Sequence, residues 1–226
     1  MRIVFWQNCL SPHQLPYIVH LLDDERVDSV VICVGETVSK DRSDMGWDLS
    51  EYEGLDKCEL YINPMPLTVD YLLSVRENES YHLFSGIRGF KFVFESFIKS
   101  LLHPIKRGVI TERPFTYYKG KADGKPLWMH KIRFMLQDRK FINSVDSVFA
   151  MGEDAAQYFK SVFTHSCVYP FVYCTKGIEG CDKNINESKL YYAFVGSLSP
   201  RKAPMDILKA LSISNDVLQM GGGNCR

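Results

Sequence analysis

Short apolar runs alternate with amphipathic stretches along most of this 226-residue chain. Residues 3–6, 27–34 and 147–151 are almost entirely apolar, and the stretches between them carry apolar residues every three or four positions. Strands that are apolar along their whole length are typical of parallel sheets, because helices cover both faces of such sheets. The order of the elements predicts one doubly wound α/β domain with a Rossmann-like parallel sheet over residues 1–174.

The clearest predicted helix follows Gly89. Its apolar residues recur at spacings of three and four along one stripe: Phe90, Val93, Phe94, Phe97, Ile98 and Leu101. Lys91, Glu95, Lys99 and Ser100 occupy the other positions. We expect the apolar stripe to face the sheet and the second set to face solvent.

The composition argues against several classes of protein. With 46% hydrophobic and 13% aromatic residues the chain can bury a core, and 27 basic against 27 acidic residues do not favour a general nucleic-acid binder. No run approaches the roughly 20 apolar residues of a membrane-spanning helix, and the first residues do not form a signal peptide. Seven cysteines without a C-x-x-C pair indicate reduced thiols. We therefore expect a cytoplasmic protein with no metal site.

The loop after the first strand (residues 8–14) contains hydrogen-bonding side chains and no glycine. In an open α/β sheet this loop lies at the carboxyl edge, where ligands bind. The missing G-x-G-x-x-G argues against a dinucleotide site and so against a dehydrogenase. Asn8, Ser11, His13 and Gln14 suit the hydroxyl groups of a sugar acceptor. The alternative is an ordinary loop in which Ser11 caps the following helix.

Two other strand ends are predicted to carry charged groups to the same edge. Arg88 suits a phosphate or carboxylate, and Glu112 suits sugar hydroxyls. We include both among the candidate acceptor-binding residues, with an ion pair between loops as the alternative for each. Since no local spacing assembles a nucleophile with its base or a set of metal ligands, the catalytic residues stay unassigned.

Residues 126–143 predict a basic helix in which aromatic and methionine residues are interleaved with cations. Trp128, Met129, Phe134 and Met135 are the large apolar members. The charged residues in and beside the helix are Lys125, His130, Lys131, Arg133, Arg139 and Lys140, with Asp138 as the single acid. This pattern is compatible with a peripheral contact to anionic lipid headgroups. The alternative is that the aromatic side chains are buried in the core and the cations are solvated.

The most specific motif lies near the end of the chain. A polar, glycine-containing segment (175–189) predicts a linker, and the apolar run that follows it ends at Gly196. The cations Arg201 and Lys202 come next, directly before an amphipathic stretch. Glycine after a buried strand lets a ligand approach the backbone, and cations at the start of a helix favour anions. These features are typical of a site for a nucleotide diphosphate.

This stretch resembles the start of the donor-binding domain of group 1 glycosyltransferases, which are retaining enzymes with two Rossmann-like domains (the GT-B fold). In that family an arginine directly follows the glycine, and a lysine comes a few residues later. Gly196 and Lys202 match, whereas Ser197 occupies the arginine position and Arg201 lies beside the lysine. The resemblance implies that these four residues bind the donor diphosphate, where positive charge stabilises the leaving group.

The resemblance extends more weakly over residues 1–174, which look like the acceptor domain. It implies an acceptor domain (1–174), a linker (175–189) and the start of a nucleotide-sugar-binding domain (190–226). The implied reaction transfers a sugar from a nucleotide-sugar to a glycan or lipid-linked acceptor of the cell-surface polysaccharide type. It retains the anomeric configuration and uses no metal and no cofactor besides this co-substrate.

Two Rossmann-like domains need on the order of 300 residues. We therefore expect this length of chain to lack transferase activity and to bind nucleotide-sugar weakly or not at all. The implied location is the cytoplasm, or the inner face of the membrane as a peripheral protein. The alternative function is a non-catalytic α/β module that binds a carbohydrate or a protein.

Overall fold

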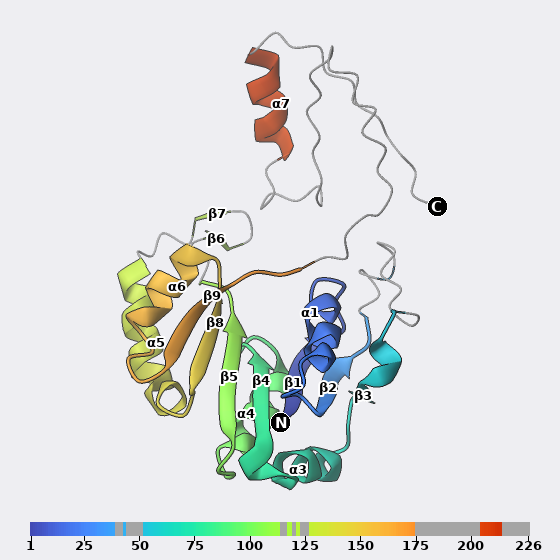
Figure 1. The fold of residues 1–226 in the computed structure, drawn as a ribbon. Coiled ribbons are helices and arrows are strands. Elements are labelled where there is room, and N and C mark those ends of the chain that lie inside the picture. The colour runs from blue at the N-terminus through green and yellow to red at the C-terminus, as the bar shows by residue number, and fades with distance from the viewer. Residues whose placement is uncertain are drawn as a thin grey trace. The chain divides into compact units, whose positions relative to one another are not determined.

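The structure is a computed structural model that describes residues 1–38, 43, 52–113, 117–118, 121–122, 127–174 and 204–213 (Figure 1). The chain divides into two units. The first comprises Met1–Pro114 and Trp128–Glu179, and the second comprises Phe115–Leu127 and Gly180–Arg226.

A seven-stranded sheet forms the centre of the first unit, and each strand is parallel to its neighbours (Figure 1). The strands are β1 (Arg2–Cys9), β2 (Ser29–Glu36), β3 (Glu59–Ile62), β4 (Ser80–Ser85), β5 (Lys106–Thr111), β8 (Ser147–Met151) and β9 (Cys167–Phe171). Their spatial order is β3-β2-β1-β4-β5-β8-β9, so the direction of winding reverses between β1 and β4. The predicted doubly wound, Rossmann-like parallel sheet is confirmed.

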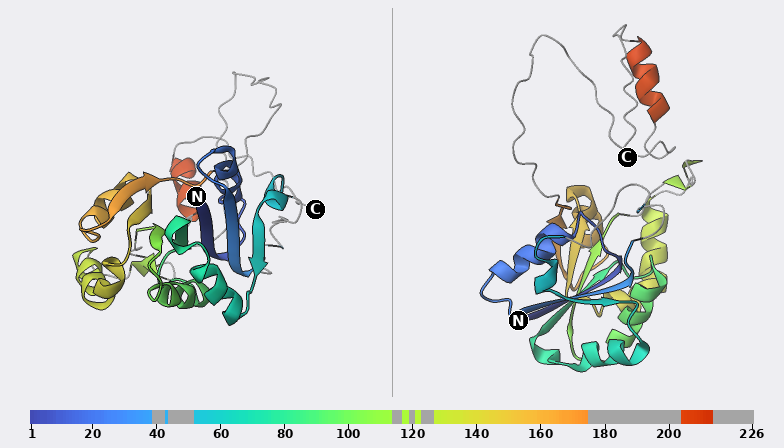
Figure 2. Two further views of the ribbon diagram at one scale, coloured as in Figure 1. Left: turned by 60° about the horizontal axis from the view of Figure 1, so that its bottom comes forward. Right: turned by 90° about the vertical axis from the view of Figure 1, so that its right-hand side faces the viewer.

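Helices lie on both faces of this sheet, as the two views in Figure 2 show. The helices of the first unit are α1 (Leu15–His20), α3 (Pro66–Ser74), α4 (Lys91–Ser100), α5 (Leu127–Ile142) and α6 (Glu153–Lys160), with 3-10 turns η1 (Leu21–Asp23), η2 (Leu55–Lys57) and η3 (Glu77–Glu79). Apolar residues of α3, α4, α5 and α6 pack in one core cluster. Those of α1 and η2 pack in the other cluster, on the opposite face.

In the second unit the structure describes an antiparallel pair, β6 (Tyr117–Tyr118) and β7 (Lys121–Ala122), and the helix α7 (Pro204–Ile213). The helix predicted to follow Lys202 is therefore present. The predicted linker (175–189) lies outside the described residues, so the domain boundaries drawn from the sequence stay predictions.

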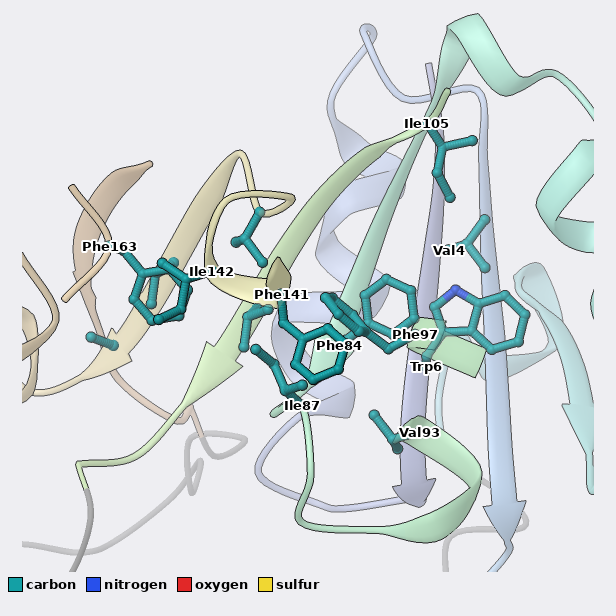
Figure 3. Packing of buried hydrophobic residues seen from close by; sticks show 14 of the residues in the cluster. Val4, Trp6, Phe84, Ile87, Val93, Phe97, Ile105, Phe141, Ile142 and Phe163 are labelled. Atoms are coloured by element: carbon teal, nitrogen blue, oxygen red, sulfur yellow. The ribbon is translucent and has the colours of Figure 1, made fainter. Parts of the chain in front are cut away.

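Aromatic rings fill the larger core cluster, between the sheet and the helices α4 and α5 (Figure 3). Trp6 is fully buried, and its ring stacks on Phe84 with centroids 6.0 Å apart. Phe97 meets Phe84 edge-on at 5.1 Å, and Phe141 of α5 continues the series at 5.9 Å from Phe97. Because each such ring removes about 150–250 Å² from water, the cluster is a major source of stability.

Helix α4 departs from the predicted pattern of burial. Val93 and Phe97 are buried as expected, but Phe90 and Ile98 are exposed and Ser100 is fully buried. The reason is tertiary, because the Ser100 hydroxyl accepts a hydrogen bond of 3.0 Å from Nε of Arg107 on β5. The buried side of α4 is thus rotated relative to the predicted apolar stripe, so that it includes Ser100 and its contact with Arg107. Helical spacing alone does not reveal this contact.

Two buried arginines satisfy backbone carbonyls near the ends of α3 and α4, where the sheet begins. The Arg107 guanidinium donates to the carbonyl oxygens of Ser100, His103 and Ile105. Arg2 donates to the carbonyls of Leu72 and Val75 at 3.2 and 3.3 Å. The last carbonyls of a helix lack intrahelical partners and carry partial negative charge, so a buried cation suits them.

We expect Arg107→Met to lower the free energy of unfolding by about 3 kcal/mol, because it leaves several buried carbonyls without donors. Lys106→Met is the matched control, since Lys106 precedes Arg107 in β5 and is exposed. It should change stability by less than about 0.5 kcal/mol. Urea unfolding followed by circular dichroism measures both, and equal effects of the two changes would contradict this account.

On the face that carries α1, the strands β5, β8 and β9 are covered by aromatic side chains of the sheet itself. Tyr81 lies across β5 at Gly108, and its hydroxyl forms a hydrogen bond with the hydroxyl of Ser147 on β8. A Cβ atom at position 108 would lie 2.9 Å from Cε1 of Tyr81 and 2.5 Å from Cδ2 of Leu83. A larger residue at this position would force the side chains of Tyr81 and Leu83 to shift, which favours glycine.

His82 is fully buried in β4 beside Trp6. Its Nδ1 accepts a hydrogen bond of 3.1 Å from the indole Nε1 of Trp6, so the neutral ring carries its proton on Nε2. Burial lowers the pKa of His82 to about 3, and Arg2 and Arg107 contribute in the same direction. The folded protein therefore keeps this ring neutral through the pH range in which a solvent-exposed histidine becomes charged.

Because the unfolded chain binds a proton at His82 below about pH 6.5 and the folded chain does not, stability should fall as the pH is lowered from 6.5 toward 3. The contribution lost between pH 7.5 and pH 5 is about 2 kcal/mol. His82→Gln, which keeps an acceptor for the Trp6 indole, should flatten this dependence. His165→Gln, at an exposed position, should not. Urea unfolding at a series of pH values distinguishes the two, and parallel curves for His82→Gln and the parent would overturn the prediction.

Candidate functional site

The carboxyl ends of β1 and β4 mark the point where the strand order reverses, and open α/β sheets bind ligands at such points. Trp6 pairs with Phe84 in the register of these two strands, so Gln7 and Ser85 occupy the next positions along. Alternation along the strands puts both side chains on the face that carries α1. Gln14, directly before α1, joins them, because its Nε2 donates a hydrogen bond of 3.4 Å to Oγ of Ser85.

Gln7 is the most unusual member of this group. Its side chain is 1% exposed, and neither amide atom has a hydrogen-bond partner among the residues that the structure describes. Burying an amide without partners costs about 2 kcal/mol or more. Such a group calls for an explanation, and a binding role is one of the few that apply. Gln7 therefore offers both a donor and an acceptor at the end of β1.

Tyr17 of α1 lies on the same face and has a similar property. Its ring packs edge-on against Phe171 at 5.1 Å, and its hydroxyl is buried without a partner among the described residues. Burial raises the pKa of Tyr17, and Tyr173 and Cys174 raise it further. The hydroxyl stays protonated at physiological pH, so it is a neutral hydrogen-bonding group like the others.

The predicted acceptor residues of the first loop take different positions. Asn8 is half-buried, lies on the opposite face of β1 from Gln7, and donates to Sγ of Cys9 at 3.4 Å. The Ser11 hydroxyl accepts from the backbone N–H of His13 at 3.3 Å, within its own turn. It makes no side-chain cap to α1, whose N-cap residue is Gln14. The predicted alternative of a Ser11 cap is therefore wrong.

His13 is exposed, and its carbonyl accepts a hydrogen bond of 3.2 Å from the backbone N–H of Cys174. Its ring lies 6.3 Å from that of Tyr173. The segment after β9 thus contacts the loop after β1, although the two are far apart in the sequence. The structure brings Gln14 of the predicted set into the group of Gln7 and Ser85, and leaves His13 at its solvent-facing side.

Arg88 forms the ion pair that the sequence left open as an alternative. Its Nε donates to Oδ1 of the buried Asp138 at 2.5 Å. The guanidinium also lies over the rings of Phe94 and Phe141, at 5.4 and 5.2 Å from their centroids. These contacts tie the loop after β4 to α4 and α5. Glu112 is exposed just after β5, and its ligand role stays a prediction.

The predicted donor residues Gly196, Ser197, Arg201 and Lys202 lie outside the described residues. Among the residues that the structure does describe, no group of three or more histidine, cysteine or acidic side chains is arranged to hold a metal ion. In the same part of the chain, no helix is both long and apolar enough to cross a bilayer.

Sequence reasoning did not select Gln7, Ser85 or Tyr17. A signal for Gln7 exists, because it is a polar residue in a strand of apolar ones and shares the face of Phe5 by alternation. That its amide would lack partners depends on the side chains around it, which are distant in the sequence. Ser85 and Tyr17 carry no local signal that separates them from ordinary residues of a strand end and a helix.

Comparisons of the chain with protein-family models, with curated proteins and with solved structures find no match. The resemblance of the terminal segment to group 1 glycosyltransferases therefore rests on the sequence motif alone.

We expect Gln7→Met to raise the free energy of unfolding by about 1–2 kcal/mol, because methionine has a similar shape and removes a buried amide without partners. Gln157→Met on the surface of α6 is the control and should have an effect below about 0.5 kcal/mol. Chemical denaturation measures both. Destabilisation by Gln7→Met would show that the amide is satisfied in the folded protein, and would remove the main reason to regard it as a binding group.

Proposed function

We propose that the first unit is the acceptor-binding half of a glycosyltransferase, which transfers a sugar from a nucleotide-sugar to a glycan or lipid-linked acceptor. One observation carries the proposal: a buried, electrically neutral group of hydrogen-bonding side chains lies where the strand order reverses. Gln7, Ser85 and Tyr17 lie on the same face of the sheet, and Gln14 is hydrogen-bonded to Ser85 there.

The chemistry of this group suits a sugar better than a phosphate. A sugar hydroxyl both donates and accepts hydrogen bonds, as do the amides of Gln7 and Gln14 and the hydroxyls of Ser85 and Tyr17. Arg88, the cation three residues after Ser85, forms an ion pair with Asp138, so its charge is already partly neutralised. The glycine-free loop after β1 likewise disfavours a dinucleotide diphosphate.

The donor side of the proposal rests on the sequence of the second unit. Arg201 and Lys202 precede α7, so the cations and the start of this helix would together favour the diphosphate of a nucleotide-sugar. Gly196 would let the diphosphate approach the backbone closely, and Ser197 would supply a hydroxyl. Charge on the leaving diphosphate would be neutralised by these cations, with no metal. The catalytic residues are not assigned.

The proposed acceptor binding is tested by titrating the protein with a panel of neutral oligosaccharides and of oligosaccharides of the kind found on lipid-linked acceptors. We expect binding that Gln7→Met abolishes and that Ser85→Ala weakens about tenfold, by loss of one or two hydrogen bonds in a dry site. Ser74→Ala, at an exposed serine of α3, should bind as the parent does. Nucleotide-sugar binding, where measured, should weaken in Lys202→Ala and not in Gln7→Met.

Three results would contradict the proposal. Failure of every oligosaccharide to bind would remove the acceptor role, and tight binding of a nicotinamide dinucleotide would indicate a dehydrogenase. Oligosaccharide binding in a protein whose nucleotide-sugar affinity is unaffected by Lys202→Ala would favour a non-catalytic carbohydrate-binding module.

A further inference from the structure

The outward face of α5 carries large apolar side chains exposed to solvent. These side chains recur at helical spacing along one side of the helix: Trp128, Met129, Ile132, Met135 and Leu136. We call them the α5 stripe. Trp128 is 61% exposed and Leu136 is 78% exposed. Four of the five, with Gln137, line an open groove of about 430 Å³. A contiguous apolar surface of this kind marks an interaction site more often than isolated exposed residues do.

The α5 stripe is distinct from the side by which α5 joins the core. Phe141 and Ile142 are buried against the sheet, and Phe134 packs against Phe159 and Phe163 at the end of α6. The alternative that the aromatic side chains of this helix are buried in the core therefore holds for Phe134, which packs against the core, and not for Trp128. Helix α5 has two apolar faces, and the first unit buries one of them.

The charged side chains of α5 are mostly basic. Asp138 is the only acid in its sequence, and this side chain is buried and paired with Arg88. The cations Arg139 and Lys140 are exposed, and Lys131 is half-buried. Lys140 is held beside the helix with its Nζ 4.9 Å from the centre of the Phe141 ring. Since the whole chain has equal numbers of acidic and basic residues, this bias is a local property of α5.

We propose that the α5 stripe and its cations dock on an anionic lipid surface. Tryptophan prefers the boundary between headgroups and acyl chains, and the stems of lysine and arginine extend along apolar surface while their charges reach the headgroups. A helix of 16 residues lies about 24 Å along such a surface. The only carboxylate of α5, that of Asp138, is buried, so α5 presents no exposed carboxylate that an anionic membrane would repel. Such a membrane complements both the apolar α5 stripe and the cations beside it.

A lipid surface fits these features better than a protein partner does. A protein interface needs polar groups that define its register, whereas Gln137 is the one polar residue among the described ones that line the groove. Flexible methionine and leucine side chains adapt to a fluid surface without a fixed partner. The inference does not depend on the proposed function, because none of the residues of the α5 stripe belongs to the group around Gln7.

Co-sedimentation of the full chain with vesicles tests the proposal. We expect binding to vesicles of phosphatidylcholine with 30% phosphatidylglycerol, weak binding to phosphatidylcholine alone, and release at high salt. Arg139→Gln and Lys140→Gln should each lower the partition coefficient about fivefold. Leu136→Ser should lower it about tenfold. The matched control is Leu67→Ser on α3, because Leu67 is 79% exposed, close to the 78% of Leu136.

Quenching of tryptophan fluorescence by brominated lipids supplies a second readout. It should occur in the parent chain and be lost in Trp128→Phe. Thermal unfolding checks that each variant keeps the parent's stability, as expected for exposed positions.

Equal effects of Leu136→Ser and Leu67→Ser, or equal binding to neutral and anionic vesicles, would overturn the proposal. It would also be overturned by light scattering that shows a dimer of the parent and a monomer of Leu136→Ser, because the occupant would then be a second copy. A chain that stays in the supernatant with both kinds of vesicle would contradict the proposal as well.

Discussion

The fold depends on the way its buried helix ends are satisfied at the amino edge of the sheet. Arg107 combines several roles at one point of the chain. Its guanidinium donates to carbonyls around the end of α4, while its backbone N–H donates to the Asp146 carboxylate at 2.7 Å and its carbonyl accepts from the Asp146 N–H at 2.8 Å. A parallel sheet covered by helices cannot expose these groups to water, so a buried cation replaces the solvent. The start of β8 is thereby fixed beside β5.

The two edges of the sheet differ in how far their buried polar side chains are hydrogen-bonded. At the amino edge the guanidinium of Arg2 donates to two backbone carbonyls and that of Arg107 to three. Near the carboxyl edge, the amide of Gln7 and the hydroxyl of Tyr17 are buried without partners among the described residues. Buried groups kept for a ligand lower stability until it binds, although Nε2 of His82 in β4 and the hydroxyl of Tyr158 in α6 also lack partners among the described residues. This difference is why we place the candidate site at the carboxyl edge.

The pair formed by Arg88 and Asp138 connects this edge of the sheet with α5. It neutralises the only acid of α5 and holds the loop after β4 against the rings of Phe94 and Phe141. As a result the exposed charges of α5 are basic. This ion pair, in which Asp138 is buried and Arg88 is half-exposed, thus engages a predicted ligand-binding arginine and shapes the charge of the proposed lipid-binding face.

The sequence by itself determined the class of fold, since apolar runs such as residues 27–34 suit a parallel sheet covered on both faces. It also located the helix after Gly89 and the loop after β1, because spacing and turn residues are local properties. Tertiary structure alone decided that Ser100 is buried, that Arg88 is paired and that the Gln7 amide lacks partners. Each of these depends on a side chain from a distant segment, and local periodicity contains no information about which segment arrives there.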